Sequence, residues 1–248
     1  MALLKSAISG RIARNSHAYV VDELGTAIVG GEFPAGSLLP PDADLEERFG
    51  VSRTVLREAM KTLAAKGLIF PRARIGTRVN DSTKWNLFDA DVLGWYFASG
   101  VTDVLLRHLC EMRQSFEPFA ARLAVANATA EDIARLKALA DQMSEARSNE
   151  AFALADLEFH LTLLAASGNP FMYSVGNLIE AALALAFQIS SPAEDPERRV
   201  AVAQSHRLVV EAIEAGDGDA ATAAMEAVIR KGSQRVTASM DSKAASDA

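Results

Sequence analysis

The sequence contains a single cysteine, Cys110, so no disulfide can form within the chain. A lone thiol is typical of proteins that work in a reducing cytoplasm, and we expect that location here. Long apolar runs are also missing. Lys5, Ser6 and Arg11 interrupt the N-terminal segment, which argues against a signal peptide. No stretch approaches the roughly 20 apolar residues of a membrane span, so the sequence predicts no membrane association.

An excess of positive charge is absent as well. The formal net charge is −7, which by itself does not suggest a nucleic-acid partner. The charge is uneven, however, because the first 80 residues carry a formal +3 and the remainder carries −10. A mildly basic head on an acidic body suits a polyanion-binding part joined to a second domain. With 248 residues, half of them hydrophobic, the chain can form one large or two modest domains.

Residues 39–69 are the stretch around which the head is organised. Their pattern predicts two short helices and a tight turn, the first helix capped by Asp42 or Asp44 and ended by Gly50. Ser52 is expected to cap the second helix. The apolar residues of that helix recur at helical spacing and form a buried stripe, made of Leu56, Ala59, Met60 and Leu63.

Three polar residues near the start of the second helix, Arg53, Thr54 and Arg57, face away from this stripe. A helix-turn-helix needs this arrangement, because Arg and small hydroxyl side chains then enter the major groove. The alternative is an ordinary helical hairpin with a solvated charged face. A basic turn follows at residues 71–76 between two short apolar runs, which predicts a hairpin wing. If the hairpin is a DNA-binding wing, its arginines contact phosphates or the minor groove; if it is a small solvated hairpin, they contact only solvent. These arginines are Arg72, Arg74 and Arg78.

These motifs resemble the winged helix-turn-helix of the GntR family of bacterial transcription regulators. The resemblance covers residues 17–79 and rests on GGEFPAGSLLP, DLEERFGVSRTVLREAMKTLAAKGLI and IGTRV. It implies binding to double-stranded operator DNA through Ser52, Arg53, Thr54, Arg57, Arg74 and Gly76. One departure is Ala43, which stands where many relatives have an arginine, so a contact expected in the family is missing.

The rest of the chain falls into a junction and a helical region. We expect an N-terminal arm at residues 1–16, a winged helix-turn-helix at 17–80, a linker helix at 81–101 and a helical domain at 102–240. Trp85 and Trp95, the only two tryptophans, are predicted to wedge the two domains together. Helices are expected at 102–127, 129–148, 150–167, 170–190, 196–215 and 217–238, with Thr129 and Asp132 at capping-box spacing. The last ten residues are expected to fray.

Polar side chains interrupt otherwise apolar helices of this second region. Asp156 and His160 are four residues apart and share one helix face, while His206 and Arg113 lie in two other largely apolar helices. A carboxylate with two imidazoles is a common metal-ligand set. The alternative is that Asp156 hydrogen-bonds His160 and that His206 satisfies a helix end.

Residues 102–238 resemble the all-helical FCD sensor domain of the FadR branch of the GntR family. The matching pieces are EMRQSFEPFAARLA, DLEFHLTLLAASGNPFM and HRLVVEAIEAGDGDAATAAM. The resemblance implies a mainly α fold with a six- to seven-helix bundle, a divalent metal such as zinc at Asp156, His160 and His206, and Arg113 as a bidentate clamp for an effector carboxylate. Val228 stands where the fourth ligand of metal-binding members is expected, so the site either has three ligands or is a polar pocket without metal.

The junction KWNLFDADVLGW and the missing last histidine are similar to regulators of sugar-acid catabolism of the galactonate-operon-repressor type. We therefore expect an effector-responsive repressor of a catabolic operon, working as a homodimer, whose effector is a small carboxylic acid. Two alternatives stay open, a metal-responsive regulator and a metal-dependent enzyme. The enzyme is the weaker hypothesis, because no nucleophile motif or general base accompanies the cluster.

Overall fold

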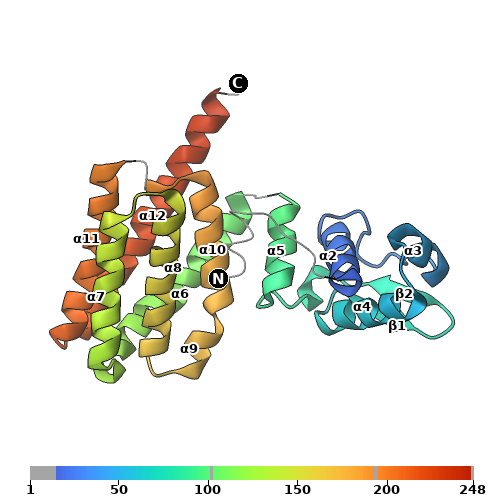
Figure 1. Cartoon of the computed structure of the whole chain (residues 1–248), viewed down its shortest axis with the longest axis horizontal. Helices are drawn as coiled ribbons and strands as arrows, with labels where there is room; N and C mark the ends of the chain where they lie inside the picture. The colour runs from blue at the N-terminus through green and yellow to red at the C-terminus, as the bar shows by residue number, and fades with distance from the viewer. Residues whose placement is uncertain (1–14, 101–102, 193–194, 247–248) are drawn as a thin grey trace. The chain divides into compact units, whose positions relative to one another are not determined.

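The computed structural model describes residues 15–100, 103–192 and 195–246, so most of the expected N-terminal arm lies outside the described residues. The chain divides at residues 101–102 into two compact units (Figure 1). The fold is mainly helical with a small two-stranded sheet, as the sequence predicts. Among the described residues, no helix has both the length and the hydrophobicity of a membrane-spanning segment.

The N-terminal unit is a winged helix-turn-helix followed by one more helix. Its elements are α2 (Ser16–Val29), α3 (Asp42–Phe49), α4 (Arg53–Ala65), β1 (Ile69–Arg72), β2 (Gly76–Val79), the short 3-10 helix η1 (Ser82–Lys84) and α5 (Ala90–Ala98). The two strands are antiparallel, with Ile69 opposite Val79 and Arg72 opposite Gly76. The predicted wing is therefore confirmed, and its first strand continues through Pro71 into the segment expected to be turn.

Local chemistry explains the turn between α3 and α4. Gly50 ends α3 in the left-handed conformation at φ 61°, and the Ser52 hydroxyl accepts a hydrogen bond from the Val55 backbone N–H at 3.5 Å. The predicted Asp42 or Asp44 cap is wrong, because Pro41 occupies the cap position and makes no side-chain hydrogen bond. Both acids lie instead in the first turn, where a negative charge complements the helix dipole.

The core of this unit surrounds Trp95 and the stripe of α4. Leu56, Ala59 and Leu63 are buried, whereas Met60 is only partly buried. Trp95 is fully buried on α5, and its indole N–H donates to the Asp22 carboxylate on α2 at 3.0 Å. The prediction that it wedges two domains together is wrong, because its ring is enclosed in the core of the N-terminal unit.

A glycine makes this packing of Trp95 possible. A Cβ at Gly25 would lie 2.5 Å from the indole ring, so only glycine lets the ring approach α2 so closely.

The C-terminal unit is a helical bundle. Its elements are α6 (Asp103–Asn127), α7 (Ala130–Glu145), α8 (Asn149–Ala166), α9 (Pro170–Ser174), α10 (Gly176–Ile189), α11 (Pro196–Glu214) and α12 (Gly218–Ser246). The capping box of Thr129 and Asp132 is confirmed at the start of α7. Two expectations are wrong. The helix expected at 170–190 breaks at Val175, and α12 continues to Ser246 instead of fraying, in a stretch without Gly or Pro after Gly232.

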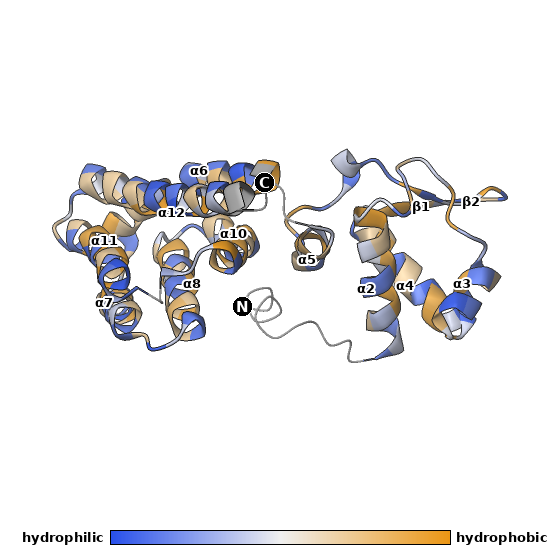
Figure 2. Ribbon diagram, turned by 90° about the horizontal axis from the view of Figure 1, so that it is seen from above, coloured by the Kyte–Doolittle hydropathy of each residue, from blue (hydrophilic) through white to orange (hydrophobic). Residues whose placement is uncertain are grey.

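Helix α8 is central in the bundle. It contacts α6, α7 and α10, and 10 of its 18 residues are buried. Figure 2 shows α6 and α12 along one side of the bundle, with α7 and α8 on the other. Asp156 and His160 lie on the buried face of α8 and therefore inside the bundle.

Candidate functional site

The start of α4 presents polar side chains to solvent. Ser52, Arg53, Thr54 and Arg57 are all exposed, opposite the stripe that packs on the core. Within the described part of the chain, no ion pair or side-chain hydrogen bond engages Arg53 or Arg57. These two guanidinium groups are therefore available to phosphate oxygens or to base edges.

The wing ends in a strained and basic turn. Arg74 has φ 64°, and no other non-glycine residue among those described has a positive φ. Gly76 follows at φ 114°, which glycine tolerates. Arg78 donates to the Gly36 carbonyl at 2.6 Å and so also holds the fold of the head. Strain at an exposed arginine is typical of a functional position.

The four residues predicted for the second site converge inside the bundle. Arg113 of α6, Asp156 and His160 of α8, and His206 of α11 are all buried. The Nε2 atoms of the two histidines are 3.4 Å apart. Asp156 Oδ1 lies 3.3 Å from His206 Nε2, and Asp156 Oδ2 lies 3.8 Å from His160 Nε2. The predicted cluster is thus one site built from three helices.

The other ring nitrogens determine the tautomers. His206 Nδ1 lies 2.9 Å from the Val202 carbonyl, which can only accept, so Nδ1 carries the proton. His160 Nδ1 lies against the Glu117 carboxylate, with the same consequence. In neutral rings both Nε2 atoms are then acceptors facing the Asp156 carboxylate. Arg113 Nη2 donates to one of these acceptors, His160 Nε2, at 3.2 Å, and a cation can satisfy the other two.

Glu117 is the residue that the sequence analysis missed. It is fully buried, and it accepts from Arg113 Nε at 2.6 Å while its other oxygen contacts His160. Its position four residues after Arg113 on a largely apolar helix is the signal that could have identified it. A carboxylate behind a metal-binding histidine is a common outer-shell partner, because it holds the ring in one tautomer and orientation.

Both buried carboxyl groups of the cluster are ionised. Burial alone raises the pKa of a carboxyl group, but Arg113 and His160 outweigh it and bring the pKa of Glu117 to about 2. For Asp156, burial is likewise outweighed by the neighbouring His206 and His160, and its pKa is also about 2. The site therefore holds two negative charges and the one positive charge of Arg113, and it favours a further cation.

The donor set fits a divalent metal ion. Bonds of about 2.0–2.1 Å in a tetrahedral site place ligand atoms about 3.3–3.4 Å apart. The two Nε2 atoms are 3.4 Å apart, and Asp156 Oδ1 lies 3.3 Å from His206 Nε2. Asp156, His160 and His206 each offer one ligand atom, and these atoms lie within 4.8 Å of one another. His160 Nε2 also accepts from Arg113 Nη2 at 3.2 Å, so a bound ion would compete with this hydrogen bond.

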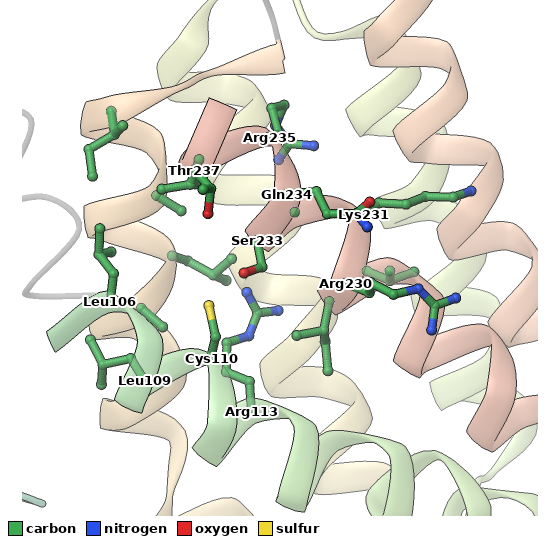
Figure 3. Close-up of a pocket in the computed structure, with 18 of the residues that line it drawn as sticks. Leu106, Leu109, Cys110, Arg113, Arg230, Lys231, Ser233, Gln234, Arg235 and Thr237 are labelled. Atoms are coloured by element: carbon green, nitrogen blue, oxygen red, sulfur yellow. The ribbon is translucent and has the colours of Figure 1, made fainter. Parts of the chain in front are cut away.

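The cluster opens into a large cavity of about 1690 Å³. Helices α6, α8, α10, α11 and α12 line it, and Figure 3 shows Arg113 on α6 facing the segment of α12 that carries Ser233 and Arg235. Glu117 occupies the side-on edge of the Arg113 guanidinium and Nη2 also bonds His160, so the predicted bidentate clamp requires release of the Nη2–His160 hydrogen bond. Val228, at the expected fourth-ligand position, lines the same cavity and cannot coordinate.

Comparisons with known proteins identify the family. Residues 17–79 match the family "Bacterial regulatory proteins, gntR family", and residues 108–231 match the FCD domain. The chain is 37% identical over 222 residues to the uncharacterized HTH-type transcriptional regulator YieP of Escherichia coli, covering 88% of this chain and 94% of that protein. It is 32% identical to the galactonate operon transcriptional repressor of E. coli, covering 88% and 95%.

A solved structure shares the fold. The structure is that of Lar, which controls the expression of the Listeria monocytogenes agr system and mediates virulence. The match has a TM-score of 0.62 at 21% identity and covers 92% of this chain and 99% of that one. The family and its relatives are regulators of transcription, which sets aside the metal-dependent enzyme. The chain therefore belongs to the GntR family of bacterial regulatory proteins, and it is a DNA-binding transcription regulator with an FCD domain.

Proposed function

We propose that the protein is an effector-controlled repressor of a catabolic operon that acts as a homodimer in the cytoplasm. Residues 17–80 bind operator DNA through Ser52, Arg53, Thr54, Arg57, Arg74 and Gly76, residues 81–101 form the junction, and residues 102–240 bind the effector. The effector is a small hydroxy-carboxylic acid such as a sugar acid. The observation that carries this proposal is the convergence of Arg113, Asp156, His160 and His206 at one cavity.

The chemistry of the cavity supports a polar acid. Nη1 of Arg113 makes no hydrogen bond among the described residues, so it can donate to the carboxylate of an effector. Hydroxyl and amide side chains along the wall suit the hydroxyl groups of a sugar chain, and these are Gln114, Ser115, Ser205, Ser233, Gln234 and Thr237. The 32% identity with a galactonate operon repressor points to the same class of compound.

We further propose that Asp156, His160 and His206 hold a divalent ion such as zinc. An ion held by three protein ligands keeps a position for an oxygen atom of the effector and strengthens its binding. Val228 leaves that position free, which suits an ion that serves effector binding. The alternative is a metal-responsive regulator in which the ion itself is the signal, and the same three ligands support it.

Release of DNA by an acid tests the main proposal. Binding of the full chain to DNA from upstream of its own gene is measured by fluorescence anisotropy, with and without galactonate and gluconate. Acid is expected to weaken DNA binding of the wild type and to have little effect on Arg113→Gln. Arg122→Gln, an exposed arginine on the same helix, is the control and should respond like wild type. Equal responses of Arg113→Gln and wild type would remove Arg113 from the effector site.

Metal content tests the ion. The purified protein is analysed by inductively coupled plasma mass spectrometry as wild type, as His160→Ala and as His108→Ala, whose histidine is exposed on α6. About one divalent ion per chain is expected in wild type and in the His108 variant, and much less in the His160 variant. A metal-free wild type that also binds no added zinc contradicts the ion and leaves the polar pocket. DNA binding that responds to zinc without acid would favour the metal-responsive regulator.

A further inference from the structure

Arg235 of α12 lies at the cavity and has no role in the cluster described above. Its side chain lines the wall, and Figure 3 places it on the same helix segment as Ser233. The Nε atom is buried and makes no hydrogen bond with any described residue. No ion pair or hydrogen bond from a described residue engages the guanidinium, so it is free to bind an anion that enters the cavity.

The charges around Arg235 reinforce this interpretation. Six basic residues line the cavity against three acidic ones, although the whole chain carries −7. The basic residues are Arg107, Arg113, Arg198, Arg230, Lys231 and Arg235. The nearby acid is Asp156, which already lies 3.3 Å from His206 Nε2. Burial lowers the pKa of Arg235, the Asp156 carboxylate opposes this, and the like charges of Arg198 and Arg113 lower the pKa further.

Other cations of the cavity have partners that Arg235 lacks. Arg113 is paired with Glu117. The Arg198 Nε atom lies 3.6 Å from Asp195 Oδ2. Lys231 donates to the Ser205 hydroxyl at 3.1 Å. Arg230 is exposed to solvent. The combination of a buried Nε and no protein counter-ion thus distinguishes Arg235 from these four residues.

The size of the cavity leaves room for a ligand that extends to Arg235. Its volume of about 1690 Å³ exceeds the roughly 300–1,000 Å³ of ordinary small-molecule sites. A compact monoacid held at Arg113 and the histidines would occupy only part of it. The Nε atom is closed to solvent, so a carboxylate or a phosphate would approach Arg235 at its two Nη atoms, which can take an oxyanion by two parallel hydrogen bonds.

We propose that Arg235 is a second anion-binding residue, and that the effector carries two anionic groups on one polyhydroxy chain. One carboxylate binds at Arg113 and the histidine cluster, and a second carboxylate or a phosphate binds at Arg235. This inference rests on the proposed acid effector and specifies its class as a dicarboxylic or phosphorylated sugar acid.

Matched acids with one or two anionic ends test the inference. Affinities of gluconate, glucarate and 6-phosphogluconate, and of galactonate and galactarate, are measured by isothermal titration calorimetry on the full chain. At least one acid with two anionic ends should bind wild type about tenfold or more tightly than its matched monoacid. A preference for glucarate or galactarate identifies the second group as a carboxylate, and a preference for 6-phosphogluconate identifies it as a phosphate.

Variants of Arg235 separate anion binding from packing. Arg235→Gln should abolish the preference for the second anionic group and leave monoacid affinity within about twofold of wild type. Arg235→Lys, which keeps the charge, should retain part of the preference. Arg122→Gln, an exposed arginine of α6 that does not line the cavity, should keep all of it. The unfolding temperature of each variant shows whether the bundle remains folded.

Two results overturn the inference in distinguishable ways. If the monoacids bind wild type as tightly as the acids with two anionic ends, or if Arg235→Gln weakens both alike, Arg235 does not bind a second anion and the monoacid effector stands. If no acid in either series binds wild type, the acid effector fails and the inference fails with it.

Discussion

Helices α4 and α8 place polar side chains in opposite environments. The polar residues at the start of α4, among them Arg53 and Arg57, are exposed and have no ion pairs within the described chain. Two polar residues of α8, Asp156 and His160, are buried, and each contacts at least one other charged or ring group. An apolar stripe on one face produces the first arrangement, and apolar residues nearly all round produce the second.

The two sites differ in where the counter-charges of their charged residues come from. A DNA-binding face needs free charges, since its partner supplies the counter-charges and releases ions on binding. A buried pocket must balance its charges within the protein, and Glu117 does this for Arg113 and His160. Substitutions on α4 should therefore change DNA binding at constant stability, whereas substitutions in the buried cluster should change stability itself.

The largest expected effect is that of Glu117→Gln. It removes the counter-ion of the buried Arg113, and breaking a buried pair costs about 3–5 kcal/mol of the free energy of unfolding. Unfolding in urea followed by far-UV circular dichroism measures this loss, because helices dominate the bundle. Glu111→Gln, an exposed acid on the same helix, is the control and should change stability by less than about 0.5 kcal/mol. Equal stability of the two variants would contradict the role assigned to Glu117.

A smaller effect is expected from Arg57→Ala. Removing an exposed arginine at the start of α4 should weaken binding to operator DNA by about 1–3 kcal/mol, and the unfolding temperature should not change. Fluorescence anisotropy measures the first quantity and thermal unfolding measures the second. Arg207→Ala, which breaks a surface ion pair with Asp141 on the bundle, should leave DNA binding intact. If Arg57→Ala binds DNA like wild type, α4 is not the recognition helix.

The smallest effect is expected from Arg74→Gly at the tip of the wing. Glycine tolerates the φ of 64° that strains an arginine, so the head should lose no stability and could gain up to about 1 kcal/mol. DNA binding should fall, because a cation of the wing is lost. Both tryptophans, Trp85 and Trp95, belong to the N-terminal unit, so their fluorescence reports unfolding of the head. A head that is destabilised, or DNA affinity that is unchanged, would show that Arg74 is retained for structure.

Much of the head followed from local patterns in the sequence. Residues 39–79 carry turn, cap and stripe signals within a short span, and the helices, the wing and the exposure of Arg53 and Arg57 all came out as predicted. The predicted cap of α3 was wrong. Pro41 and Asp42 are both plausible cap residues, and a shift of the helix start by one residue exchanges one for the other. Local signals place an element but locate its ends less well.

The pocket was predictable only in part. Their places in largely apolar helices singled out Asp156, His160, His206 and Arg113, and the family resemblance assigned them to one pocket. Glu117 was missed because an acid four residues from an arginine usually forms an exposed helix pair. Its full burial follows from the packing of α6 in the bundle, which no local pattern reports.

Sequence alone determined the order of helices, the winged head and the residue types available for each site, because helix periodicity, caps and glycine turns act over a few neighbouring residues. Tertiary structure decided that Trp95 lies inside the head, that Glu117 balances the pocket, and that Arg235 has a buried Nε without a partner. These three outcomes depend on which helices pack together. Burial and charge balance are properties of the assembled bundle, and no single helix carries them.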